Sequence, residues 1–110
     1  MELQILQKTY DMMLYAYPAL AQFPRSEKHT LAAEVKSCMG NMVRMIIRAN
    51  KERQKMEHLR QLDAELELLR TLVRLSMELG LLPPRKYEQW SRQLAEIGKM
   101  LGGWIKSTRY

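Results

Sequence analysis

The sequence predicts an all-α protein, a single antiparallel up-down four-helix bundle that occupies residues 1–110. Apolar residues recur every three or four positions through four long segments, which is the spacing of one buried helix face. The breaks between these segments are short, and no segment shows the alternating pattern of a half-buried strand. A chain of 110 residues has room for one domain and one core. The expected helices span about residues 3–22, 28–49, 54–79 and 84–107.

The first segment, residues 3–22, has one apolar face. That face comprises Leu3, Leu6, Tyr10, Met13, Tyr17 and Leu20. Pro18 should kink the last turn or end the helix early, because a proline ring clashes with the preceding turn of a helix. A break follows at residues 23–26, and Ser26 or Thr30 is suited to cap the second helix.

The second helix, residues 28–49, is separated from the third by the least clear of the three breaks. Its apolar seam comprises Leu31, Val35, Cys38, Met42, Met45 and Ala49. Residues 50–53 contain neither glycine nor proline, so one continuous helix over residues 28–79 is the alternative. Such a helix would far exceed the usual length in globular domains, and Asn50 is well suited to a helix C-terminus. We therefore expect a turn at residues 50–53.

The third helix, residues 54–79, stops before Gly80 and has a wide apolar arc. At about 100° per residue, two flanks lie on either side of Leu69. One comprises Leu62, Leu66, Val73 and Met77, and the other comprises Leu68, Leu72, Leu75 and Leu79. Either this helix lies deep in its own bundle, or the second flank, through Leu68, Leu72 and Leu75, packs against another subunit.

The last helix, residues 84–107, starts near Pro84 and carries the clearest apolar stripe of the chain. The stripe comprises Tyr87, Trp90, Leu94, Ile97, Leu101 and Trp104. Gly98 and Gly102 lie one turn apart, although glycine costs a helix stability. Close approach of another helix explains them, and this helix is either a neighbour in the bundle or part of a second subunit. We favour the second subunit.

The residues give no sign of an enzyme, a metal site or a cofactor. His29 and His58 have no histidine or cysteine at ligand spacing, and no phosphate-binding glycine loop is present. Cys38 lies in an apolar row, which favours a reduced, buried packing residue. The amino terminus lacks a signal-peptide pattern, and no apolar run approaches the roughly 20 residues of a membrane span. We expect a cytoplasmic protein without a membrane partner.

The net charge of +6 predicts attraction to phosphate polymers or acidic protein surfaces. Between residues 36 and 60, Glu52 and Glu57 are outnumbered by basic residues: Lys36, Arg44, Arg48, Lys51, Arg53, Lys55 and Arg60. In an up-down bundle this turn lies at the same end as both termini, near Lys99, Lys106 and Arg109. We therefore expect one basic end that binds nucleic acid in a strongly salt-dependent way.

Two further rows of basic residues lie on helix faces. Arg70 and Arg74 share the polar side of the third helix and repel each other at this spacing, unless Glu67 and Glu78 pair with them or an acidic partner lies beside them. Both explanations stay open. The second row, on the last helix, comprises Arg85, Arg92, Lys99 and Lys106, and Glu88 and Glu96 should neutralise its upper part.

With these residues in view, the chain resembles the accessory variability determinant (Avd) proteins of diversity-generating retroelements. These proteins are related to four-helix proteins encoded in intervening sequences of bacterial ribosomal RNA genes. The resemblance rests on the order and spacing of motifs along nearly the whole chain. They are Leu6-Gln-Lys-Thr-Tyr-Asp11, Tyr17-Pro18, Phe23-Pro24-Arg25, Leu69-Arg70-Thr-Leu-Val-Arg74-Leu75 and Ile97-Gly98-Lys-Met-Leu-Gly-Gly-Trp-Ile105. The chain departs from relatives in its second turn, which has no glycine, and at Pro83, where others have a capping serine.

The resemblance implies a four-helix protomer that assembles into a homopentameric barrel with a basic outer surface. It also implies a non-catalytic partner of the retroelement reverse transcriptase and its RNA, needed for error-prone copying of template-repeat RNA into cDNA. Arg70 and Arg74 match an arginine pair of the family, so the resemblance implies that they contact the polymerase or nucleic acid. The alternatives are an intervening-sequence protein without a polymerase partner and a purely structural helical oligomer.

Overall fold

The computed structural model describes residues 2–109, which form four long helices and one short helix and contain no strand. The helices are α1 (Leu3–Ala21), α2 (Arg25–Lys28), α3 (Leu31–Lys51), α4 (Met56–Glu78) and α5 (Pro84–Thr108). The molecule is elongated, with extents of 45 × 24 × 19 Å. The prediction of an all-α bundle is therefore confirmed.

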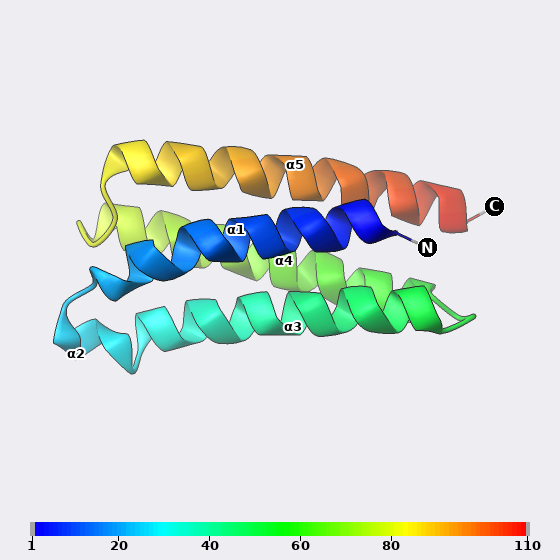
Figure 1. Ribbon diagram of the computed structural model, residues 1–110, viewed down its shortest axis with the longest axis horizontal. Helices are drawn as coiled ribbons and strands as arrows, with labels where there is room; N and C mark the ends of the chain where they lie inside the picture. Colours follow the sequence, from blue (N-terminus) through cyan, green and yellow to red (C-terminus); the bar gives the residue numbers. More distant parts are fainter. Residues whose placement is uncertain (1, 110) are drawn as a thin grey trace.

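The four long helices run up and down in chain order (Figure 1). α3 packs between α1 and α4, and α5 closes the bundle by packing on both α4 and α1. Both ends of the chain and the turn between α3 and α4 lie at one end of the molecule, whereas α2 and the start of α5 lie at the other (Figure 1). We call the end that holds both chain termini and the α3–α4 turn the basic end, because the predicted cluster of cations lies on it.

α5 has the orientation that its sequence predicts. Trp90, Leu94, Ile97, Leu101 and Trp104 are all buried, and Tyr87 packs against the core from its edge. Proline begins the helix, since Pro84 occupies a position in the first turn where no backbone N–H is needed. The α3 seam is confirmed in the same way, with Met45 partly buried and its other five members fully buried.

The face predicted for α1 is only partly correct: Leu20 is buried and Leu6 and Met13 pack against the core, but Leu3, Tyr10 and Tyr17 are exposed. α1 places Ile5, Thr9, Met12, Ala16 and Ala19 in the core together with Leu20. The physical reason is size: the alanines allow close packing, and the Thr9 hydroxyl is satisfied within the helix by donating to the Ile5 carbonyl, 2.8 Å away. The predicted stripe is rotated towards the surface, and it leaves Leu3 60% exposed, Tyr10 55% and Tyr17 43%. The helix also continues through Pro18 to Ala21, so the early end is wrong.

The turn between α3 and α4 occupies residues 52–55, so the continuous helix is wrong. Lys55 explains how a turn without glycine or proline forms. Its ammonium group donates to the carbonyl oxygens of Ala49 and Glu52, and so satisfies acceptors that the end of α3 leaves open. A cation at a helix C-terminus also interacts favourably with the helix dipole.

Two other helix ends involve residues that the sequence singles out. Gly80 has φ of +76°, the left-handed conformation that glycine adopts without strain, and it ends α4. Its N–H donates to the Met77 carbonyl while the N–H of Leu81 donates to Ser76, which is the Schellman pattern. Thr30 precedes α3 but does not cap it with its side chain, because its hydroxyl donates to the Glu27 carboxylate, 2.7 Å away.

Candidate nucleic-acid and partner interface

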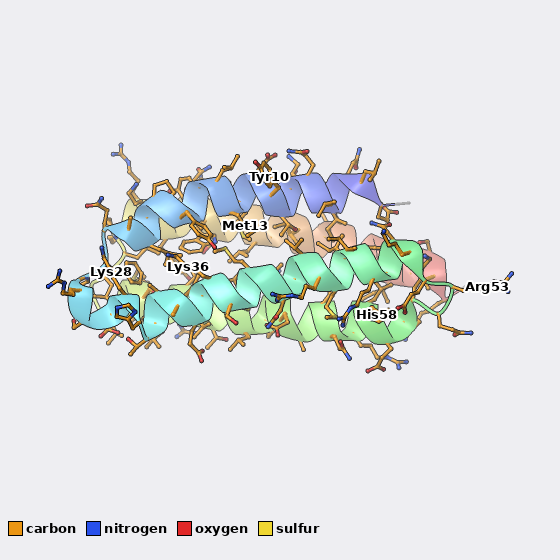
Figure 2. All side chains as sticks on the ribbon, turned by 60° about the horizontal axis from the view of Figure 1, so that its bottom comes forward. Tyr10, Met13, Lys28, Lys36, Arg53 and His58 are labelled. Carbon is orange, nitrogen blue, oxygen red and sulfur yellow. The ribbon has the colours of Figure 1, made fainter. Side chains whose placement is uncertain are left out.

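The basic end gathers cations from three helices. Arg44 and Arg48 come from the last turns of α3, Arg53 from the turn, Arg60 from α4, and Lys106 from the end of α5. The arrangement follows from the topology, since the α3–α4 turn and the C-terminus of α5 meet at this end (Figure 1). Figure 2 shows Arg53 projecting from this end, and Lys28 at the opposite end of the molecule.

Most of these cations are exposed and lack a carboxylate partner among residues 2–109. This set comprises Arg44, Arg48, Lys51, Arg53, Arg60, Lys99, Lys106 and Arg109. Arg44 donates to the Asn41 side chain, 2.8 Å away, and this neutral contact leaves its charge uncompensated. Lys55 is the exception in the predicted group, because its ammonium group is engaged by the backbone at the end of α3.

The two acids of this region form no ion pair with the lysines and arginines among residues 2–109. The Glu52 carboxylate binds Nε2 of His58, and Glu57 accepts a hydrogen bond from the Gln61 amide. Nδ1 of His58 is buried without a partner among the described residues. Neither Glu52 nor Glu57 therefore forms an ion pair with a lysine or arginine within residues 2–109, and basic residues still outnumber acidic ones in this region.

Arg70 and Arg74, the predicted pair on α4, have different surroundings. Arg74 forms an ion pair with Glu78 at 3.4 Å, with both side chains more than half exposed, so this contact contributes little stability. Arg70 has no carboxylate partner in the described part of the chain. It reaches across to α5 instead, where Nη2 donates to the Leu94 carbonyl at 3.4 Å. Local pairing thus accounts for Arg74 but not for Arg70.

The basic row on α5 is less neutralised than expected. Glu96 forms an ion pair with Lys8 of α1 at 3.0 Å, and so it compensates a charge on another helix rather than the row. Neither Arg85 nor Arg92 forms an ion pair within residues 2–109, although Glu88 lies beside both, so neutralisation of the upper row by Glu88 stays a prediction. The cationic surface continues from the basic end along α5.

Two apolar strips remain at the surface of the single chain. The α4 strip comprises Leu68, Leu75 and Leu79, which are 43%, 42% and 57% exposed. Leu72 lies on the same flank but is buried within the chain. The arrangement rules out the interpretation that α4 lies deep in its own bundle. Packing of Leu68, Leu72 and Leu75 against another subunit stays a prediction.

The second strip, the α1 strip, was not predicted as a surface. It comprises Leu3, Tyr10, Leu14 and Tyr17, and Ile47 of α3 is exposed as well. Figure 2 marks Tyr10 and Met13 on α1, above Lys36 on α3, whose Nζ lies 5.0 Å from the centre of the Tyr17 ring. The signal in the sequence was a second apolar row on the same helix, Ile5, Met12, Ala16 and Ala19, which competes for the core.

The two glycines predicted to lie at an oligomer contact differ. Gly98 faces α4 of its own chain, where an added Cβ would lie in ordinary contact with Leu66 and too close to the Arg70 guanidinium, which would have to move. Gly102 is exposed, and a Cβ added to it would meet nothing within 4 Å. The structure thus provides a bundle neighbour for Gly98, whereas the subunit contact predicted for both glycines stays a prediction.

No group of three or more histidine, cysteine, aspartate or glutamate side chains in residues 2–109 is arranged to hold a metal ion. Cys38 is buried, as expected, and its thiol lies 3.0 Å from the Glu65 carbonyl oxygen and 3.1 Å from the Glu65 carboxylate. Burial raises the pKa of this thiol well above its ordinary value, and the hydrogen bond to Glu65 adds to the effect. None of the described helices has the length and apolarity needed to cross a bilayer.

A comparison with known protein families agrees with these features. A family model described as bAvd-like matches residues 3–108, nearly the whole chain. The curated proteins include no match to the chain. This match confirms the resemblance to Avd proteins that the sequence motifs indicate. The chain belongs to the bAvd-like family.

Proposed function

We propose that the protein is the accessory subunit of a diversity-generating retroelement that binds the reverse transcriptase and the template-repeat RNA or its cDNA in the cytoplasm. In this role it supports mutagenic reverse transcription without performing chemistry itself. The observation that carries the proposal is the set of exposed cations at the basic end that lack carboxylate partners, in a chain that matches the family from residue 3 to residue 108. Such cations release counterions from a phosphate backbone, and this release favours binding regardless of sequence.

The protein acts as a homopentamer in this proposal. The α1 strip and the α4 strip support assembly, because each exposes large apolar side chains on one helix. The two strips differ in composition and lie on different helices, so a contact between the α1 strip of one protomer and the α4 strip of the next is heterologous. Repeated heterologous contacts close into a ring when the rotation between protomers permits it.

The test of nucleic-acid binding compares two triple variants with the same change in charge. The first replaces Arg48, Lys51 and Arg53 at the basic end with glutamine. The control replaces Arg25, Lys28 and Lys86, at the opposite end, with glutamine. Binding to a 20-nucleotide single-stranded RNA is measured by fluorescence anisotropy at several salt concentrations.

Loss of three phosphate contacts should reduce the slope of log affinity against log salt by about 2, since each contact contributes about 0.7 for a single strand. We expect this reduction in the basic-end variant and little change in the control. Equal reductions in the two variants would show that net charge, rather than the basic end, determines binding. An intervening-sequence protein without a polymerase would bind RNA in this assay but would not retain a reverse transcriptase.

A further inference from the structure

The Arg70 side chain occupies space that glycine provides on the neighbouring helix. A Cβ added at Gly98 would lie well inside 3.0 Å of Arg70 Nη2, closer than real Cβ atoms approach. It would also lie 3.6 Å from Arg70 Cζ and 3.5 Å from Leu66 Cδ2, which are ordinary contacts. The guanidinium therefore rests on the backbone of α5 at Gly98, where it donates to the Leu94 carbonyl.

A cavity of about 200 Å³ opens beside this guanidinium. It is lined by Arg70 from α4 and by Tyr87, Ser91 and Leu94 from α5. Apart from the apolar Leu94, the lining side chains end in hydrogen-bond donors: a guanidinium and two hydroxyl groups. The Tyr87 and Ser91 hydroxyls have no hydrogen-bond partner among residues 2–109, and no carboxylate lines the cavity.

This donor set matches an anion with acceptors in several directions. The guanidinium offers several N–H groups, of which the Leu94 carbonyl uses one, and the hydroxyls approach from the other helix. A tetrahedral phosphate group can accept from both helices, whereas the oxygens of a carboxylate lie in one plane. The site also belongs to a protein of net charge +6 with a cationic row on α5, so its surroundings attract a polyanion.

We propose that the cavity between α4 and α5 is a subsite for one phosphate group of a nucleic-acid backbone, and that Gly98 is the positioning residue that lets Arg70 reach it. The inference rests on the proposed function, because it assumes that the protein binds nucleic acid. It assigns Gly98 a role within the chain. An alanine at this position would push the guanidinium away from the Leu94 carbonyl and out of the cavity.

The experiment compares Gly98→Ala with Gly103→Ala in the full-length protein. Both glycines lie within α5, and alanine favours a helix over glycine at either position. A Cβ at Gly103 would meet nothing within 4 Å, so Gly103→Ala is the matched control. Arg70→Ala and the double variant Arg70→Ala/Gly98→Ala complete a cycle. The probe is the same 20-nucleotide single-stranded RNA, and thermal unfolding is recorded for every variant.

We expect Arg70→Ala to weaken RNA binding several-fold and to lower the salt slope by about 0.7, the value for one phosphate contact with a single strand. Gly98→Ala should have a similar effect without lowering the melting temperature, and Gly103→Ala should bind as the wild type does. In the Arg70→Ala background, Gly98→Ala should change nothing further. A merely structural role of Gly98 would not produce this dependence on Arg70.

Other outcomes separate the inference from the proposed function. If Arg70→Ala weakens RNA binding but Gly98→Ala does not, the positioning role is overturned and the proposed function stands. If Arg70→Ala leaves RNA binding unchanged while the basic-end triple variant weakens it, the phosphate subsite is overturned. Loss of reverse-transcriptase binding with unchanged RNA affinity would assign Arg70 to a protein contact and would overturn the subsite as well. If no variant changes RNA binding, the proposed function fails together with the inference.

Discussion

α1 and α5 pack side by side in the bundle, yet they use their large side chains in opposite ways. α5 places both of its tryptophans in the core, with Trp90 fully buried. α1 places alanines and Thr9 in the core and leaves Tyr10 and Tyr17 at the surface. Both helices contribute to the same core, so this difference is not a matter of position in the fold. The difference arises because α5 has one apolar stripe, whereas α1 has two that compete for the core.

The difference identifies the helix that leaves large apolar side chains exposed. On α5 the residues outside the stripe are mainly polar or small, so the helix has one apolar face and the core covers it. On α1 the core covers the face with small residues, and the larger apolar side chains remain exposed to solvent. Burying this area would be favourable at about 25 cal/mol per Å². The α1 strip is therefore a surface suited to a contact between protomers, as is the α4 strip.

The largest expected effect is on the stability of the core. Trp90→Ala removes a fully buried aromatic side chain and leaves a cavity, so we expect it to lower the free energy of unfolding by about 3–5 kcal/mol. Tyr10→Ala should change the stability of the isolated protomer by less than about 1 kcal/mol, since this side chain is already exposed. Urea unfolding of both variants at a concentration where the protein is monomeric measures the difference. Similar losses in the two variants would contradict the contrast between the two helices.

The next effect concerns assembly. Tyr10→Asp in the α1 strip and Leu75→Asp in the α4 strip should each abolish the oligomer, because a charge in an apolar contact is costly to desolvate. Light scattering should then give the protomer mass of 13.0 kDa for each variant. Gln89→Asp on α5, an exposed residue in neither strip, is the control and should assemble as the wild type does.

Mixing the two variants tests whether the contact is heterologous. The Leu75→Asp protein keeps an intact α1 strip, and the Tyr10→Asp protein keeps an intact α4 strip. An equimolar mixture should therefore form one contact and stop at a dimer of 26 kDa, twice the protomer mass of 13.0 kDa. If the Tyr10→Asp protein alone still assembles, α4 strips pair with each other and the heterologous contact is wrong.

The smallest effect is an absence of reaction at Cys38. Its raised pKa keeps the thiol protonated in the folded protein across pH 7–9, and the thiolate is the form that reacts with alkylating reagents. We expect iodoacetamide at pH 8 to modify the folded protein at least about a hundred times more slowly than the urea-unfolded protein. Mass spectrometry over time measures both rates. Rapid modification of the folded protein would show that Cys38 is accessible, contrary to the packing described for α3.

The fold was predictable where one apolar stripe has no competitor. α5 and α3 follow their seams, and Gly80 ends α4 because it can adopt positive φ. α1 was not predictable by the same rule, since choosing the largest apolar side chains for the core favours Tyr10 and Leu3 over Ala16. The packing of neighbouring helices decides between the two stripes, and a single helix does not contain that information.

The candidate site was predictable in its location but not in its pairing. The up-down topology alone places the α3–α4 turn and the end of α5 together, so the basic end followed from helix order. Contacts between helices were not visible in the sequence. Glu96 forms its ion pair with Lys8 of α1 rather than with a basic residue of α5. The Arg70 side chain extends from α4 across to α5, where its guanidinium lies against Gly98. Pairs of this kind depend on the register between helices.

Co-purification tests most directly the proposal that this protein binds the retroelement reverse transcriptase and its template RNA. The tagged protein is expressed with the retroelement reverse transcriptase and template RNA, and it is recovered at low salt. The account predicts that both are retained, and that reversing the charges of Arg70 and Arg74 with glutamate reduces their recovery while the bundle remains folded. Recovery of neither polymerase nor template RNA with the wild-type protein would contradict the account.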